Sequence, residues 1–354
     1  MADFITQFPA NEVVSRENFN SRISLANTAM ANIKGSIDNH KADNKNPHKT
    51  TLAQVGGSRD NMARNWDLTN PANQRGITTL TVTAPLQYGL DCWSSYNCTI
   101  KVNSGNSTNI RFLSTADHKR FVQMHESQEV LKAGVTYTLT IFARCNIVSG
   151  TVGLRPCDSS YSGAEQIDLA ASSDYIPYFF TFTPSSDVHG YGIEILAQNT
   201  VNDYADIDIK YWKLEPGTAQ TLMRLNENNQ WVLNDPSPNP QQVLDECQRY
   251  HQVLKGFYAP GAAELIDGVD VLMFGINLPV PMRITPSFPP TNINVQIAGA
   301  GGDNYYTNLP VSFKWGSNTR LSLVAVNPDI SKYPRSRPIT ARIDTDLHFY
   351  AELQ

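Results

Sequence analysis

The sequence predicts a mainly β protein in which an N-terminal helical, coiled-coil-like stem precedes two β-sandwich-like modules. Three observations lead to this fold class. A heptad pattern occupies residues 16–37, short runs with a two-residue period recur after residue 64, and clusters of Gly, Ser, Asn and Asp separate those runs. Because the chain has 354 residues, we expect more than one hydrophobic core. The predicted parts are 1–63, 64–221, 222–240 and 241–354.

Residues 16–37 are expected to form the stem helix. Their apolar positions follow spacings of three and four, the pattern of a heptad seam: Phe19, Ile23, Ala26, Met30, Ile33 and Ile37. One isolated helix of this length could not keep such a stripe away from water, so we expect the seam to contact copies of the same chain. Isoleucine at several seam positions favours more than two helices, and a homotrimer is predicted without settling the oligomer number. An amphipathic helix packed on its own chain is the alternative.

A polar connector is expected after the stem, because Gly35 weakens a helix and Pro47 stops one. It reads HKADNKNPHKTTLAQVGG over residues 40–57. His40 and His48 flank Asp43, and on a three-fold axis one such histidine from each copy would offer nitrogen ligands to a metal ion. A histidine beside a turn more often caps a helix or bonds a neighbouring chain. We therefore expect neither a metal nor another cofactor.

Residues 64–221 are expected to form the first sandwich. The clearest strands are YTLTIFA at 137–143, PYFFTFT at 177–183 and YGIEIL at 191–196, and DIDIKYWKLEPGTAQT at 206–221 closes the module. Short alternating strands divided by turn residues are typical of a β-sandwich. The segment 222–240 is rich in Asn and Pro and is predicted to be a linker.

The second module is expected to begin with a helix over residues 240–253. Asn239 suits the N-cap position and Pro240 the first helical position. One face of that helix would carry the apolar residues Val243, Cys247, Tyr250 and Leu254. Strand-like segments follow at 269–278, 320–326 and 342–353, and a second sandwich-like domain is therefore predicted.

Composition argues against several classes of protein. Lys and Arg number 28 against 33 Asp and Glu, a formal net charge of −5, so nucleic acid is not an expected partner. The first residues have neither the basic nor the apolar region of a signal peptide, and no apolar run is long enough to span a membrane. We expect synthesis in the cytoplasm without membrane insertion. The five cysteines form no CxxC pair and are predicted to be buried free thiols.

Enzyme motifs fail when their spacing is checked. HESQE at 125–129 lacks the second histidine of HExxH, and the run GAGGDN has Asn304 where a dinucleotide fingerprint has its third glycine. Asp206 and Asp208 could act as paired carboxylates, but alternate residues of one strand more often lie at a solvated edge or bind calcium. We therefore expect no catalytic activity.

Exposed aromatic rings are the candidates for binding sugars, because a ring stacks on the apolar face of a pyranose while polar neighbours bond its hydroxyls. The second module offers Tyr305, Tyr306, Trp315, Tyr333, Arg335 and Arg337, and the first offers Trp93, Tyr96 and Tyr161. Tyr305 and Tyr306 are preferred, since residues 299–308 are predicted to form a loop rich in Gly and Asn. Packing in a core or against another subunit is the alternative for each ring.

Several segments resemble proteins of bacteriophage tails. The block HxADxxNPHxxTxAQVG at 40–56 is similar to a short repeat in the stems of tail fibres and baseplate proteins. NWDLTNPANQRG at 65–76 and the strand at 206–221 resemble sandwich modules of phage and prophage tail proteins, although Cys92 stands where that family has the arginine of a DRW motif. DECQRYHQ at 245–252 and LPVPMRITP at 278–286 resemble a small domain at the distal end of tail fibres.

The resemblance implies a jelly-roll sandwich like that of carbohydrate-binding modules, in a tail fibre or receptor-binding protein. Such a protein would trimerise, attach to other tail or baseplate proteins through its N-terminus and bind bacterial surface polysaccharide with its distal modules. We expect it in the virion on that basis. A purely architectural baseplate or decoration protein without glycan binding is the alternative. A depolymerase would normally need a β-helix repeat, which the sequence does not show.

Overall fold

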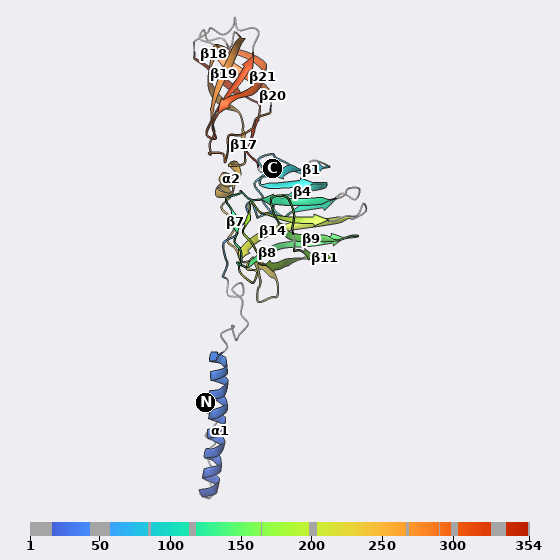
Figure 1. Cartoon of the computed structure of the whole chain (residues 1–354), viewed down its shortest axis with the longest axis vertical. Helices are drawn as coiled ribbons and strands as arrows, with labels where there is room; N and C mark the ends of the chain where they lie inside the picture. The colour runs from blue at the N-terminus through green and yellow to red at the C-terminus, as the bar shows by residue number, and fades with distance from the viewer. Residues whose placement is uncertain are drawn as a thin grey trace. The chain divides into compact units, whose positions relative to one another are not determined.

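The computed structural model describes residues 16–42, 57–83, 86–112, 118–163, 165–197, 204–266, 269–289, 291–298, 304–326 and 338–352. The chain divides into two units, Met1–Gly56 and Gly57–Gln354. Its described residues are mainly β, with two helices, as Figure 1 shows. Neither of these helices is long and apolar enough to cross a membrane.

The first unit contains helix α1 (Arg16–Ala42), which extends beyond the predicted range 16–37. Three seam residues, Ile23, Met30 and Ile33, are 44%, 61% and 56% exposed. They give the described part of the helix an apolar stripe. Ala26, another residue of the seam, is exposed as well. Phe19 and Ile37 of the seam, and His40 and His48 of the connector, lie outside the described side chains.

Two six-stranded antiparallel sheets form the first module of the second unit. The first sheet has the order β1 (Thr79–Val82), β4 (Cys98–Asn103), β5 (Ser107–Phe112), β14 (Ala205–Pro216), β8 (Tyr137–Ile147) and β11 (Ser172–Phe182). The second has the order β10 (Ile167–Asp168), β9 (Val152–Cys157), β13 (Gly192–Ala197), β6 (Lys119–Met124), β3 (Trp93–Tyr96) and β2 (Gln87–Leu90). A small pair, β12 (Val188–His189) with β7 (Val130–Leu131), flanks them. The predicted sandwich is confirmed.

Aromatic rings from both sheets meet at the centre of the sandwich core. Trp93 of β3 stacks on Phe121 of β6, with ring centroids 4.7 Å apart and an angle of 5° between the planes. Trp212 of β14, in the other sheet, tilts against Trp93 at 4.8 Å. All three rings are fully buried. Because aromatic pairs add to the hydrophobic gain of burial, this cluster ties the two sheets together.

Strand β14 changes its alternation partway along. Ile207 and Ile209 are buried in the core, at odd positions. A bulge interrupts the pairing with β8 between Ile209 and Tyr211. After the bulge the core positions are even, and Trp212 and Leu214 point into the core. The strand can therefore place apolar side chains in the core on both sides of the bulge.

The segment 222–240 is folded, which corrects the prediction of a linker. It contains a hairpin of β15 (Met223–Leu225) and β16 (Trp231–Leu233). Leu222 and Met223 are buried against Phe142 of the first sheet. The ammonium of Lys213 lies 2.6 Å from Asp235 Oδ1 in a fully buried position. Few apolar residues occur in this segment, but together they cover one patch of the sandwich.

Helix α2 (Pro240–Gln248) begins as predicted, because Asn239 Oδ1 accepts a hydrogen bond of 2.9 Å from the amide of Gln241. It ends before the predicted residue 253, since the chain continues as β17 (His251–Leu254), which pairs with β24 (Leu347–Tyr350). A closed barrel follows, in the order β18 (Phe257–Ile266), β19 (Val269–Asn277), β22 (Arg320–Val326), β21 (Asn304–Gly316), β20 (Thr291–Ala298) and β23 (Pro338–Ile343).

The barrel corrects the prediction of a second sandwich. β23 pairs with both β18 and β20, and this closes the sheet on itself. An inward and outward alternation of side chains is common to barrels and sandwiches, so the pattern of the sequence does not distinguish them. The barrel core contains Leu272, Phe274 and Leu323.

Buried polar groups join α2 and β17 to the first sandwich. Asp91 Oδ1 lies 3.1 Å from His251 Nδ1 and accepts a hydrogen bond of 2.8 Å from Arg75. Burial lowers the pKa of His251, although Asp91 opposes that effect. The Sγ atoms of Cys92 and Cys247 lie 3.6 Å apart at the same contact. All five cysteines are free and buried, as predicted.

We expect Leu222→Ala to destabilise the protein and Leu225→Ala to leave it unchanged. Leu222 is fully buried and Leu225 is 45% exposed, so only the first substitution opens a cavity. The expected loss is roughly 2–5 kcal/mol for Leu222→Ala and under about 0.5 kcal/mol for Leu225→Ala. Denaturant unfolding measures both. Limited proteolysis should spare 222–240 in the wild type, and rapid cutting there would contradict the packed hairpin.

Candidate functional site

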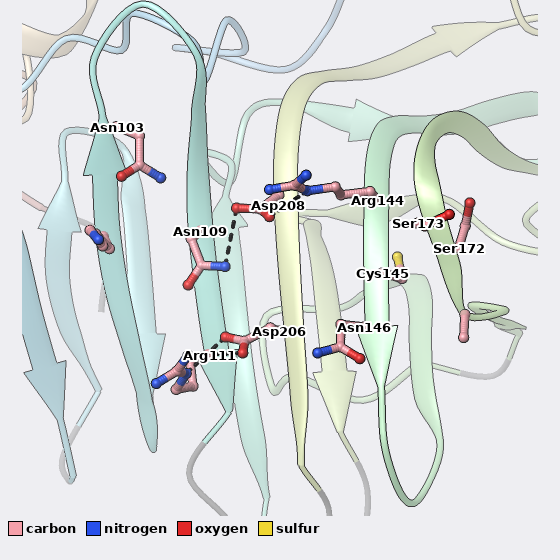
Figure 2. A pocket seen from close by; sticks show the side chains of 12 residues that line it. Asn103, Asn109, Arg111, Arg144, Cys145, Asn146, Ser172, Ser173, Asp206 and Asp208 are labelled. Atoms are coloured by element: carbon pink, nitrogen blue, oxygen red, sulfur yellow. Dashed lines mark hydrogen bonds and ion pairs between the residues drawn. The ribbon is translucent and has the colours of Figure 1, made fainter.

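An open groove of about 700 Å³ lies on the face of the first sheet that points away from the core (Figure 2). Strands β4, β5, β14, β8 and β11 contribute its side chains. Most of the lining is polar or charged: Lys101, Asn103, Asn109, Arg111, Arg144, Cys145, Asn146, Ala171, Ser172, Ser173, Asp206 and Asp208. The groove is thus a hydrogen-bonding surface supported by a rigid sheet.

Strand register arranges the polar side chains in two rows that cross the sheet. In the first row the paired residues are Lys101, Asn109, Asp208 and Arg144. In the second row they are Thr99, Arg111, Asp206 and Asn146. Each strand contributes residues two positions apart, which lie on the same face of the sheet. A period of two in each strand therefore produces a flat array of polar groups.

Each carboxylate of β14 is paired with an arginine from a different neighbouring strand. Arg111 of β5 donates two hydrogen bonds to Asp206, of 2.8 and 2.9 Å. Arg144 of β8 donates from Nε to Asp208 Oδ2 at 2.8 Å, and Asn109 donates to Asp208 Oδ1 at 3.1 Å. The strand lies inside the sheet, so the interpretation of these carboxylates as residues of a solvated edge is wrong.

The ion pairs shift the pKa values of their members. Burial raises the pKa of Asp206, but hydrogen bonds from Arg111 and Tyr204 outweigh burial and hold that pKa below its usual range. The Tyr204 hydroxyl donates to Asp206 Oδ2 at 2.5 Å. The hydrogen bond with Asp208 raises the pKa of Arg144 in turn. Asp206 consequently carries its negative charge at neutral pH.

Two tyrosines support the cationic side chains. The guanidinium carbon of Arg144 lies 5.3 Å from the ring centre of Tyr175, and the ammonium of Lys210 lies 4.2 Å from the same ring. The guanidinium of Arg111 lies 5.6 Å from the ring centre of Tyr204. A cation over an aromatic face is attracted by the ring quadrupole. These contacts restrict the directions that the arginines can adopt.

The groove is a poor site for a metal ion. Among the residues that the structure describes, no three His, Cys, Asp or Glu side chains are grouped as metal ligands would be. Asp206 and Asp208 face arginines, whose charge repels a cation. The alternative of a histidine metal site at His40 and His48 concerns side chains outside the described ones.

The aromatic residues predicted to bind sugars do not line this groove. Trp93 is fully buried and donates its indole N–H to the carbonyl of Asn65 at 3.1 Å, which overturns its interpretation as an exposed ring. Tyr96 is half-buried on β3 of the other sheet. Tyr161 lies in a turn after β9, with the guanidinium of Arg120 4.8 Å from its ring centre.

The structure describes the backbone around some of the second-module residues that were predicted to bind sugars, but not their side chains. Residues 304–308 belong to β21, so the prediction of a loop over 299–308 is wrong there. Residues 304–308 pair with the preceding strand β20 in a hairpin, so they extend the sheet instead of forming a loop. Six residues of this module were predicted as candidates for binding sugars, and their side chains lie outside the described ones: Tyr305, Tyr306, Trp315, Tyr333, Arg335 and Arg337.

Sequence reasoning identified the two carboxylates but missed the other side chains of the two rows. Lys101, Asn109, Arg111 and Arg144 come from strands far from β14 in the chain. The alternation of polar and apolar residues in β4 and β5 was the available signal, since it places these residues opposite the core. The pairing order of the strands, which the sequence does not supply, brings them together.

No protein-family model matches the sequence, and no curated protein matches it. Similar solved structures include one described as "CBM4 structure and function", 16% identical over 36% of this chain and 97% of that chain, with a TM-score of 0.30. The tandem CBM22-1-CBM22-2 domain of Paenibacillus barcinonensis Xyn10C is 8% identical over 83% of this chain and 100% of that chain, with a TM-score of 0.27. The adhesin domain of Epf from Streptococcus pyogenes is 12% identical over 84% and 98%, also at 0.27. At these values the likeness is no more than a general one of fold.

We expect Arg111→Gln to raise the pKa of Asp206 toward the ordinary value of about 3.9, because the variant removes the charge and the paired hydrogen bonds that lower it. The lowered pKa means that the pair stabilises the fold above about pH 3.9 and loses this effect as pH falls through the folded pKa. NMR titration of the side-chain carboxyl carbon measures the change. Arg144→Gln is the control, since Arg144 pairs with Asp208, and an equal shift in both variants would contradict the assignment.

Proposed function

We propose that the protein is a non-catalytic glycan-binding protein and that the groove on the first sheet is its binding site. The observation that carries this proposal is the pair of polar rows across β4, β5, β14 and β8. The groove volume of about 700 Å³ is within the range of about 300–1,000 Å³ that is common for ligand sites. Amide, guanidinium and carboxylate groups are the partners that bond sugar hydroxyls.

The side chains of the groove are held in position before a ligand arrives. Arg111 and Arg144 each make an ion pair with a carboxylate and a contact with a tyrosine ring. Ordering a long side chain on binding costs about 0.5–1.5 kcal/mol, and this cost is reduced where the side chain is already ordered. A glycan can thus gain from several weak hydrogen bonds along the rows.

The wider proposal is a structural protein of a bacteriophage tail. Its support is the similarity of residues 40–56 to the stems of tail fibres, together with the apolar stripe of α1. In this proposal three copies associate through α1, the N-terminus attaches to other tail or baseplate proteins, and the β modules contact bacterial polysaccharide. Linking three weak sites can raise the apparent affinity by roughly 10² to 10⁴. An architectural virion protein without glycan binding is the second candidate.

We expect Asn109→Ala and Arg144→Ala each to weaken glycan binding by about 10-fold to 100-fold, because each removes a hydrogen-bonding group from the first row. A glycan array followed by calorimetry on the bound glycan measures this loss. Lys132→Ala is the matched control: Lys132 makes a 2.9 Å ion pair with Asp187 and does not line the groove. Unfolding midpoints should be compared for all variants.

Two results would contradict the assignment of the groove as a glycan-binding site. If no glycan binds, the architectural candidate is favoured. If binding survives the groove variants but is lost in Tyr305→Ala with Tyr306→Ala, the binding site lies on the barrel, as the sequence first suggested.

We expect Ile23→Asp with Ile33→Asp to dissociate a trimer into monomers, since both residues belong to the seam and a buried charge there is costly. Light scattering on the full chain gives the mass. Leu25→Asp is the control, because Leu25 is 70% exposed and lies off the heptad seam. A mass that is unchanged by the seam variants, or lowered equally by the control, would show that the seam is not the contact.

A further inference from the structure

The carboxylates of the groove are already engaged within the protein. Both oxygens of Asp206 accept hydrogen bonds from Arg111, and one also accepts from Tyr204. Both oxygens of Asp208 accept as well, from Asn109 and Arg144. The two carboxylates therefore act chiefly as supports for their neighbours. Of roughly eight lone-pair positions on the two carboxylates, about three stay open to a ligand.

Hydrogen-bond donors, in contrast, stay available. Arg144 is 48% exposed and uses Nε for Asp208, so both of its terminal nitrogens are left for a ligand. Arg111 is 53% exposed and retains Nη1. Lys101 is exposed, and no carboxylate in the described part of the chain pairs with it. The unsatisfied chemistry of the groove is that of donors and positive charge.

Charge counting agrees with this asymmetry. The lining contains three cationic side chains and two carboxylates, an excess of one positive charge, although the whole chain carries a formal charge of −5. Lys101 and Arg144 are the ends of one row that crosses four neighbouring strands. At a strand spacing of about 4.8 Å the row is about 14 Å long. A ligand that reaches both ends spans more than one sugar ring.

We propose that the groove binds an anionic polysaccharide, whose acidic groups contact Arg144 and Lys101. This inference rests on the proposed function of the groove. The planar guanidinium of Arg144 can donate two parallel hydrogen bonds to a carboxylate or a phosphate, and Lys101 supplies a point charge. Asn109 and Asn103, between and beside these cations, provide amides for the neutral hydroxyls.

The experiment compares acidic polymers with their neutral counterparts. Polygalacturonate, alginate, hyaluronan and polysialic acid are each paired with a carboxyl-reduced form, in which the acid has become a primary alcohol on the same backbone. A glycerol-phosphate teichoic acid tests phosphate as the source of charge, and neutral glucans and mannans complete the panel. Binding of the full chain to each polymer is measured by calorimetry.

We expect at least one acidic polymer to bind at least about 10-fold more tightly than its neutral counterpart, since a charge-assisted hydrogen bond contributes about 1.5–3 kcal/mol. Raising the salt from about 0.05 M to about 0.5 M should weaken the acidic ligand and leave a neutral one nearly unchanged, because salt screens exposed charges. Lys101→Gln and Arg144→Gln should reduce the preference for the acidic form. Lys132→Gln, the control outside the groove, should retain it.

Other outcomes separate this inference from the proposed function. Equal binding of an acidic polymer and its reduced form, or binding of neutral glycans alone, would overturn the acidic specificity and leave the glycan site standing. Binding of no polymer in the panel would count against the proposed function itself. A preference for the teichoic acid over every carboxylated polymer would retain the anionic ligand and assign its charge to phosphate.

Discussion

The bulge in β14 is the constraint on which both faces of the first sheet depend. Before it, Ile207 and Ile209 are in the core, and after it Trp212 takes a core position. A shift of one residue moves every following side chain to the opposite face of a strand. Without the bulge Trp212 would point away from Trp93, and the aromatic contact between the two sheets would be lost.

The outward face of β14 has two different uses along its length. At one end Asp206 is open to the groove and carries Arg111. At the other end Lys213 and Glu215 are fully buried, and the Lys213 ammonium binds Asp235 from the folded segment 222–240. A buried charge requires a partner, whereas an open one can be shared with a ligand. The ionic groups at the covered end of the strand therefore stabilise the fold, and those at the open end line the groove.

Alternation along single strands was sufficient to predict much of the fold. The segment 320–326 coincides with β22 because its apolar residues repeat every second position. Facts that depend on distant parts of the chain could not be predicted in this way. The pairing that brings Lys101 and Asp208 into one row joins strands far apart in the chain. The closure of the barrel also depends on pairing between distant strands, so the sequence of each single strand does not reveal it. Trp93 shows why the role of a single residue is hard to predict from sequence: an aromatic ring can stack on a sugar or pack in a core, and this ring is buried in the core.

The strand β11, at one of the two edges of the same sheet, limits pairing between molecules. An edge strand exposes unpaired backbone groups, which can capture a strand of another molecule. β11 contains Pro177, which has no N–H to offer, and its register with β8 is irregular between Ser172 and Ile176. Its free edge is therefore a poor template for further pairing. Two copies held close together would therefore not readily join their sheets through this edge.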